Sequence, residues 1–162
     1  MSSQKMNIAL EVNGEKVEST VPVRLNLVDF LRGELGLTGS HVGCEHGVCG
    51  ACTVLVDDAP ARGCLMLAVQ ADGARVETIE GLSESGTILA LQEAFIARNA
   101  LQCGYCTPAM LVSAHAYLVA GGSGDHTQIR EAISGNYCRC TGYQSIVEAI
   151  ADVANAMGED RS

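Results

Sequence analysis

Apolar residues at every second position open the chain and predict a β-hairpin over residues 7–21. The alternation runs on both sides of Asn13-Gly14, a dipeptide that favours the type I′ turn of two-residue hairpins. Asn26 can then cap a helix whose apolar residues recur at helical spacing until Gly36 ends it. The rest of this half predicts a cysteine-rich loop at 39–52, a strand at 53–56, a turn at 57–60 and a late strand at 76–79.

The apolar period changes to that of helices after Gly81, and four helices are expected in the remainder. They are a helix over 88–96, one from Thr107-Pro108 to Gly121-Gly122, one capped by Asp125 with Gln128 and ended by Gly135, and one over 144–157. The fold class is therefore α+β. A small mixed sheet crossed by one helix is expected in residues 1–82, and a four-helix bundle in residues 83–162. We place the boundary within 82–86, where serine and glutamate interrupt the apolar pattern.

Composition and charge narrow the class of function. The chain of 162 residues is 48% apolar but only 4% aromatic, so its core must be largely aliphatic. The net charge of −9 is spread over both halves without a basic stripe, which argues against nucleic-acid binding. Residues 1–7 lack the apolar region of a signal peptide, and the most apolar stretch, 109–120, is shorter than the roughly 20 residues of a membrane span. We therefore expect a cytoplasmic chain without a membrane span, which only partner proteins would bring to the inner face of a membrane.

Eight cysteines form two sets of four, and none is left over. In a cytoplasmic chain this number favours metal over disulfides. The first four have the spacing C-x4-C-x2-C-x11-C of plant-type ferredoxins, and four thiolates are what one [2Fe–2S] cluster needs. We call them the N-terminal set: Cys44, Cys49, Cys52 and Cys64.

Three glycines lie among the first three of these cysteines. Gly43, Gly47 and Gly50 are expected to let the loop turn backbone N–H groups towards the sulfurs, because glycine tolerates positive φ. Such hydrogen bonds offset the negative charge of a cluster and tune its potential.

Two other metal sites compete for the N-terminal set. Zinc accepts four cysteines but usually takes two close pairs, whereas here three cysteines fall within nine residues. Cys44-Glu45-His46 looks like half of a Rieske ligand pair, but no matching second pair occurs in the sequence. We therefore interpret His46 as a solvated loop residue.

The remaining four cysteines lie at the starts of two predicted helices. Cys103 and Cys106 precede the helix that begins at Thr107, and Cys138 and Cys140 precede the last helix. Helix N-termini carry partial positive charge and free N–H groups, which favour a thiolate-bound anionic cluster. Cys-x-x-Cys alone also suits a redox dithiol, but the two motifs together favour a second [2Fe–2S] site. These four residues are the C-terminal set.

Three motifs carry a resemblance to a known family. They are GCEHGVCGACT at 43–53, QCGYCTP at 102–108 and GNYCRCTGY at 135–143. Their sequences and order resemble the iron–sulfur part of the molybdenum hydroxylases. This family includes xanthine dehydrogenase, aldehyde oxidoreductases, aerobic carbon monoxide dehydrogenase and bacterial dehydrogenases of N-heteroaromatic compounds. The resemblance covers about residues 5–156, and the ordered pair of cysteine sets is its most specific part.

The resemblance implies a β-grasp, plant-type ferredoxin-like domain followed by a four-helix domain. It also implies a small subunit that joins a large molybdopterin subunit and a medium FAD subunit, for which we expect a dimer of heterotrimers. By the family's arrangement the C-terminal set holds the cluster next to molybdopterin, and the N-terminal set holds the one nearer FAD. Gln102 and Cys140 resemble the residues that contact the pterin. Ala109 and Tyr137 depart from the common pattern, though neither is a ligand position.

The expected function is electron transfer from the molybdopterin centre through two [2Fe–2S] clusters to FAD. The chain would then be part of an oxidoreductase without a substrate site or catalytic residues of its own. The competing hypothesis is a redox-sensing iron–sulfur module. Such a module would need an exposed, labile site and usually a DNA- or ligand-binding domain, which this compact acidic chain does not offer.

Overall fold

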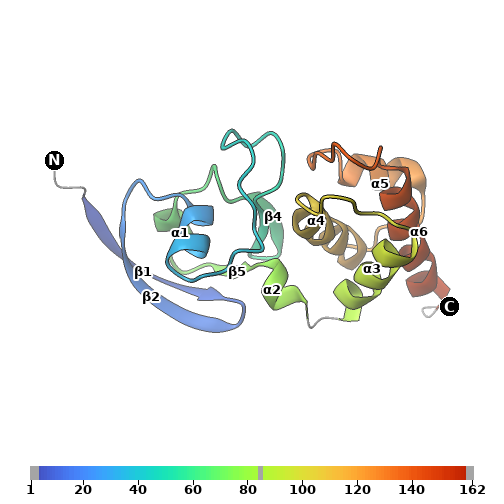
Figure 1. Cartoon of the computed structure of the whole chain (residues 1–162). Helices are drawn as coiled ribbons and strands as arrows, with labels where there is room; N and C mark the ends of the chain where they lie inside the picture. Colours follow the sequence, from blue (N-terminus) through green and yellow to red (C-terminus); the bar gives the residue numbers. More distant parts are fainter. Residues whose placement is uncertain (1–3, 84–85, 160–162) are drawn as a thin grey trace.

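The computed structural model describes residues 4–83 and 86–159, which form a sheet unit followed by a helical unit (Figure 1). The sheet unit contains β1 (Lys5–Val12), β2 (Glu15–Pro22), α1 (Leu27–Gly33), β3 (Thr53–Val56), β4 (Ala59–Arg62), the 3-10 helix η1 (Ala68–Ala71) and β5 (Arg75–Glu77). A short helix, α2 (Ile79–Leu82), leads into the helical unit. That unit contains α3 (Gly86–Ala97), α4 (Thr107–Val119), α5 (His126–Ala132) and α6 (Gln144–Glu159).

The five strands form one mixed sheet in the order β2-β1-β5-β3-β4. β1 is antiparallel to β2 but parallel to β5, and β3 is antiparallel to both of its neighbours. The predicted hairpin is confirmed, since Asn13 and Gly14 both have positive φ, at 52° and 82°. The parallel pairing of β1 with β5 closes the sheet between residues far apart in sequence.

The core of the sheet unit lies between the sheet and α1. Ile8, Leu10 and Val12 of β1 point to one face of the sheet and meet Phe30 and Leu31 of α1 there. The predicted cap of α1 is also confirmed, because the Asn26 side chain accepts a hydrogen bond from the Asp29 N–H at 2.8 Å.

Three element boundaries differ from the sequence prediction. The helix predicted to run to Gly36 ends at Gly33, three residues before that glycine adopts its φ of 71°. Residues 59 and 60, predicted as part of a turn, belong to β4; Pro60 is tolerated because β4 is an edge strand. Ile79, predicted to end a strand, instead begins α2.

In the helical unit, α3, α4, α5 and α6 surround one apolar cluster. The predicted helix start at Asp125 is confirmed, since its side chain accepts a hydrogen bond from the Gln128 N–H at 2.9 Å. Ile96, which the spacing groups with the apolar residues of α3, is 70% exposed and stays outside the core. No helix within the described residues is long and apolar enough to cross a bilayer.

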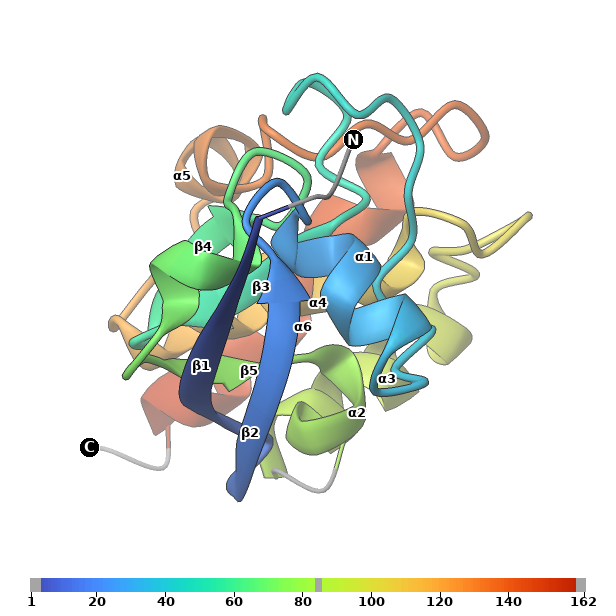
Figure 2. The ribbon, with the colours of Figure 1, turned by 90° about the vertical axis from the view of Figure 1, so that its left-hand side faces the viewer.

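The two units share a buried interface on β3. Val54 packs into the sheet–α1 cluster, whereas its neighbour Leu55 joins the cluster of the helical unit, because successive strand residues point to opposite faces. When the molecule is turned by 90° about the vertical axis, the sheet lies in front of α4 and α6 (Figure 2). Leu82 of α2 also joins the helical cluster, and Glu80 accepts a hydrogen bond from the Gly39 N–H at 2.7 Å. α2 thus contacts both units. The predicted domain boundary lies within residues 82–86, of which residues 84 and 85 lie outside the described residues.

Leu55→Ala should therefore weaken the contact between the units. Leu55 is 3% exposed, and truncating a leucine in such a site costs about 2–5 kcal/mol of unfolding free energy. The matched control is Leu89→Ala on α3, where the side chain is 47% exposed and the expected change is within about 0.5 kcal/mol. Urea unfolding followed by circular dichroism measures both variants. Equal midpoints for the two would contradict the interface.

Candidate iron–sulfur centres

The N-terminal set is built around a loop between α1 and β3. Backbone N–H groups of His46 and Cys49 each donate to the Cys44 sulfur at 3.4 Å. These bonds, that from Cys49 first, lower the pKa of the Cys44 thiol from 9.0 to about 6. The loop therefore favours a thiolate at Cys44 before any iron binds, as expected for a metal ligand.

The glycines of this loop act in two ways. Gly47 and Gly50 both have a φ of 75°, so the expectation that they supply positive φ is confirmed. Gly43 has a different role, because a side chain there would place its first carbon 3.0 Å from the Cys49 sulfur. It is the missing side chain of Gly43 that leaves room beside this sulfur.

Cys52 is the buried thiol of this site, and Cys64 lies beside it, half-buried. Burial raises the pKa of Cys52 to about 11, and the neighbouring thiol of Cys64 adds to the increase. Cys52 ends the loop directly before β3, and Cys64 follows β4. The antiparallel pairing of these two strands thus brings the third and fourth cysteines together.

The C-terminal set joins two loops of the helical unit. The sulfurs of Cys103 and Cys140 lie 3.5 Å apart on the surface. Burial raises the pKa of Cys106 to about 12, and the side chain of Cys138 raises it further. Cys106 is the N-cap of α4, so the expected lowering of its pKa by the helix start is outweighed by desolvation.

Cys138 has the opposite balance. Burial raises the pKa of its thiol, but hydrogen bonding by Thr141 outweighs burial and leaves the pKa lowered. The Thr141 hydroxyl lies 3.1 Å from the Cys138 sulfur. The Cys138 backbone N–H donates to the Tyr143 hydroxyl at 2.8 Å, which holds this loop against the start of α6.

The thiols of each set lie close enough to shift one another's pKa. The side chain of Cys49 acts on the pKa of Cys44, that of Cys64 on Cys52 and that of Cys138 on Cys106, and the sulfurs of Cys103 and Cys140 lie 3.5 Å apart. Two thiolates on one tetrahedral metal, with metal–sulfur distances near 2.3 Å, are about 3.8 Å apart. The 3.5 Å between Cys103 and Cys140 is close to this value.

The four thiols of each set suit a [2Fe–2S] cluster, which takes two thiolates on each of its irons. The His46 ring faces the carbonyl of Cys44 through a short Nδ1 contact, which agrees with a loop residue rather than a Rieske ligand.

The loops that carry the two sets meet each other. The Tyr137 N–H donates to the Cys49 carbonyl at 2.8 Å, so the residue directly before Cys138 is hydrogen-bonded to a cysteine of the N-terminal set. Tyr105 stacks on His41 with ring centroids 4.6 Å apart, and its hydroxyl donates to the Val42 carbonyl at 2.8 Å. In Figure 1 these loops lie side by side at the top, between the two units.

Gln102 and Cys140 are brought together, although 38 positions separate them. The Gln102 amide donates to the Cys140 carbonyl at 3.0 Å, and both side chains are exposed beside the C-terminal set. Arg139 is exposed as well. This is the surface on which sequence reasoning expects a pterin of another subunit.

Sequence reasoning missed Asn136 and Arg62. Asn136 is buried and bonds to the N-terminal loop, and Arg62 donates to the Gly135 carbonyl at 2.7 Å. The sequence shows Asn136 only as part of the GNYCRCTGY motif, because its partners Gly50 and Thr53 lie far away in the sequence, in the other unit. The one signal in the sequence that could have indicated a structural role is the position of Asn136, two residues before Cys138.

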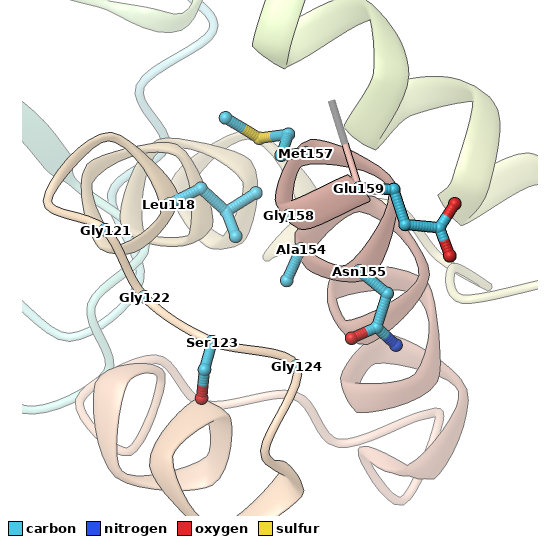
Figure 3. A pocket seen from close by; sticks show the side chains of 10 residues that line it. All are labelled: Leu118, Gly121, Gly122, Ser123, Gly124, Ala154, Asn155, Met157, Gly158 and Glu159. Atoms are coloured by element: carbon cyan, nitrogen blue, oxygen red, sulfur yellow. The ribbon is translucent and has the colours of Figure 1, made fainter. Parts of the chain in front are cut away.

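A surface pocket lies away from both cysteine sets, between the ends of α4 and α6 (Figure 3). It encloses about 620 Å³, and no cysteine lines it. Its Gly-x-Gly segment, 122–124, follows a helix rather than a strand, so the context of a dinucleotide site is missing. Its lining residues are Leu118, Gly121, Gly122, Ser123, Gly124, Ala154, Asn155, Met157, Gly158 and Glu159.

A ferredoxin-like sheet unit and a helical unit, each with four paired thiols, define an iron–sulfur protein with two cluster sites. Residues 10–77 match the 2Fe-2S iron-sulfur cluster binding domain family, and residues 78–151 match the [2Fe-2S] binding domain family. The chain belongs to the small iron–sulfur subunits of the molybdenum hydroxylases, whose molybdopterin and FAD lie on partner subunits. In this family such a subunit transfers electrons within an oxidoreductase.

Three relatives illustrate this membership. Caffeine dehydrogenase subunit gamma of Pseudomonas sp. strain CBB1 is 55% identical over 91% of this chain and 90% of its own length. Nicotine 6-hydroxylase small subunit of Paenarthrobacter nicotinovorans is 50% identical over 96% of this chain and 94% of its own length. The crystal structure of quinoline 2-oxidoreductase from Pseudomonas putida 86 contains a chain with 48% identity and a TM-score of 0.90, each chain covered over 99%.

Gly50→Ala should disrupt cluster binding. The new methyl group would lie 2.2 Å from the Gly135 carbonyl oxygen, at a backbone φ of 75°. Gly73→Ala is the matched control, since Gly73 has a φ of 77° and nothing within 4 Å of the added carbon. The control should cost about 1–2 kcal/mol of stability but keep all iron, whereas Gly50→Ala should lose iron. Iron analysis and visible circular dichroism distinguish them, and full iron in Gly50→Ala would contradict the close contact.

Proposed function

We propose that the two sets of cysteines are the ligands of the two [2Fe–2S] clusters. The observation that carries this proposal is the pairing of the thiols. In the N-terminal set, Cys44 with Cys49 and Cys52 with Cys64 would each serve one iron. In the C-terminal set, Cys103 with Cys140 and Cys106 with Cys138 would do the same.

When bound, a [2Fe–2S] cluster accepts and releases one electron at a time, which converts a two-electron oxidation into single steps. The residues of this chain supply the surroundings. Backbone N–H groups of His46 and Cys49 favour negative charge on the Cys44 sulfur, and burial at Cys52 and Cys106 disfavours it. Such surroundings tune the potential of the cluster that each site would hold.

The direction of transfer runs from the C-terminal set to the N-terminal set, as in the family. Gln102 and Cys140 are proposed as the contacts of the pterin. Their hydrogen bond supports this role, since it holds an exposed amide over the loop of a ligand cysteine. Cys140 would then serve both the cluster and the pterin edge, which would make a short connection between the two cofactors.

The substrate of the complex is proposed to be an N-heteroaromatic compound, bound on the large subunit. Relatives named for caffeine, nicotine and 6-hydroxypseudooxynicotine are 55%, 50% and 51% identical to this chain. An aldehyde oxidoreductase subunit of Escherichia coli strain K12 is 42% identical.

The assembly is proposed to be a cytoplasmic dimer of heterotrimers with large and medium subunits. Within this chain we propose two folding units, residues 1–82 and 83–162, the second arranged as a four-helix bundle. The packing of α3 to α6 around one apolar cluster supports the bundle. The redox-sensor alternative is not favoured, because the relatives are enzyme subunits.

Single serine substitutions should assign each set to one cluster. The wild-type chain should contain about four iron and four acid-labile sulfides, with two distinct EPR signals on reduction. Cys49→Ser should lose half of the iron and one signal, and Cys138→Ser should lose the other signal. His46→Ala is the control and should keep both signals. One zinc per set, or loss of both signals in each serine variant, would contradict the assignment.

Gln102→Ala should slow the entry of electrons without disturbing the clusters. In the purified complex we expect substrate to reduce the clusters about tenfold more slowly, which is the usual size of an outer-shell effect. Reduction by dithionite and the EPR signals should stay unchanged. Gln128→Ala, an exposed glutamine on α5 outside both cysteine-bearing loops, is the matched control. Equal substrate-driven rates in both variants would refute the pterin contact, and the mass of the same complex tests the dimer of heterotrimers.

A further inference from the structure

Asn136 lies buried where the two cysteine-bearing loops meet. It belongs to the helical unit, two residues before Cys138, and its side chain is only 2% exposed. Its amide reaches Gly50, which lies between Cys49 and Cys52 of the N-terminal set. A single side chain thus connects the backbone beside one site to the backbone beside the other.

The amide of Asn136 is held on both of its ends. Its Nδ2 donates to the Gly50 carbonyl at 3.2 Å and to the Thr53 hydroxyl at 3.3 Å. Its Oδ1 accepts from the Ser113 hydroxyl of α4 at 2.8 Å. Because all these groups are buried, an unpaired partner would carry a desolvation penalty, and the bonds fix the amide in one orientation.

The residues on either side of Asn136 strengthen the connection. The Tyr137 N–H donates to the Cys49 carbonyl at 2.8 Å, and the Gly135 carbonyl accepts from Arg62 at 2.7 Å. A side chain on Gly50 would lie 2.2 Å from that same carbonyl, so the two backbones are in direct contact. Three successive residues, 135–137, therefore bind the sheet unit.

The remaining contacts between the units are of two kinds. Apolar side chains such as Leu55 and Leu82 pack together, and this packing specifies rotation and sliding less strictly than hydrogen bonds do. Other polar contacts between the cysteine-bearing loops are made by Tyr105, which is exposed, with Val42 and His41, whereas the contacts of Asn136 are buried. Hydrogen bonds are directional, and those of Asn136 join backbone next to ligand positions of both sets.

We propose that Asn136 is a positioning residue that sets the distance and relative orientation of the two clusters. This inference rests on the assignment of the cysteines as ligands made above. It does not depend on the direction of transfer, on the pterin contact or on the substrate. Without its amide donor, the two loops would lose their common buried anchor and could shift relative to each other.

The magnetic interaction of two reduced clusters reports on this geometry. Each reduced [2Fe–2S] cluster carries an unpaired electron, and the dipolar coupling of two such spins falls steeply with distance and depends on orientation. Full reduction of the wild-type complex should therefore give splitting or faster spin relaxation that is absent when one cluster is oxidised. The midpoint potential of each cluster serves as a separate check on its own surroundings.

The test compares Asn136→Asp with Asn155→Asp in the purified complex. Asn136→Asp keeps the shape of the side chain but removes the N–H donor to Gly50 and Thr53. Asn155 lies exposed on α6, so its variant introduces the same charge away from the loops. We expect Asn136→Asp to keep its iron but lose the wild-type splitting, and Asn155→Asp to retain it.

Each result decides the proposal. Wild-type splitting in Asn136→Asp would overturn the positioning role while leaving the ligand assignment intact. If Asn136→Asp loses iron, Asn136→Ala decides instead, since it removes the same donor bonds without adding a charge; reduced splitting supports the proposal and unchanged splitting overturns it. A wild-type complex without two EPR signals would overturn the ligand assignment, and this inference with it.

Discussion

The packing of α4 on β3 determines where both cysteine sets lie. β3 alternates between the two cores, so Val54 stabilises the sheet unit and Leu55 the helical unit. Cys52 directly precedes β3, and Cys106 directly precedes α4. The contact between β3 and α4 therefore controls the distance between Cys52 and Cys106. The hydrogen bonds of Asn136 fix the relative position of the two loops more closely.

The thiols of each set differ in how readily they lose a proton. Cys44 and Cys138 have lowered pKa values because of hydrogen bonds, whereas burial raises the pKa values of Cys52 and Cys106. Cys52 and Cys106 therefore hold their protons more strongly than Cys44 and Cys138, and iron must displace those protons when it binds. One part of each site is therefore hydrogen-bonded and another part is buried. Such surroundings tune the reduction potential of a cluster without a change of ligands.

Local features of the sequence predicted much of this structure. The Asn13-Gly14 turn, the Asn26 and Asp125 caps and the strand at β3 depend on residues within a few positions of one another, so their signals survive in a single sequence. The strand containing Pro60 and the short helix α2 were missed, because pairing with β3 and packing between units decide them. Asn136 was missed for the same reason: its partner Gly50 belongs to the other unit. The cysteine spacing predicted two sets, but the division into pairs, such as Cys106 with Cys138, requires the folded loops.

The two sets differ in the length of chain that each must close. The N-terminal set is contained in one stretch between α1 and η1, whereas α4 and α5 separate Cys106 from Cys138. Closing a longer loop costs more chain entropy, so the second site depends on helices that have already folded and packed. During synthesis the N-terminal site is also completed first, since all four of its cysteines leave the ribosome before Cys103. The sheet unit therefore gathers its four cysteines within a short stretch of chain, whereas the helical unit needs α4 and α5 in place before its four cysteines can meet.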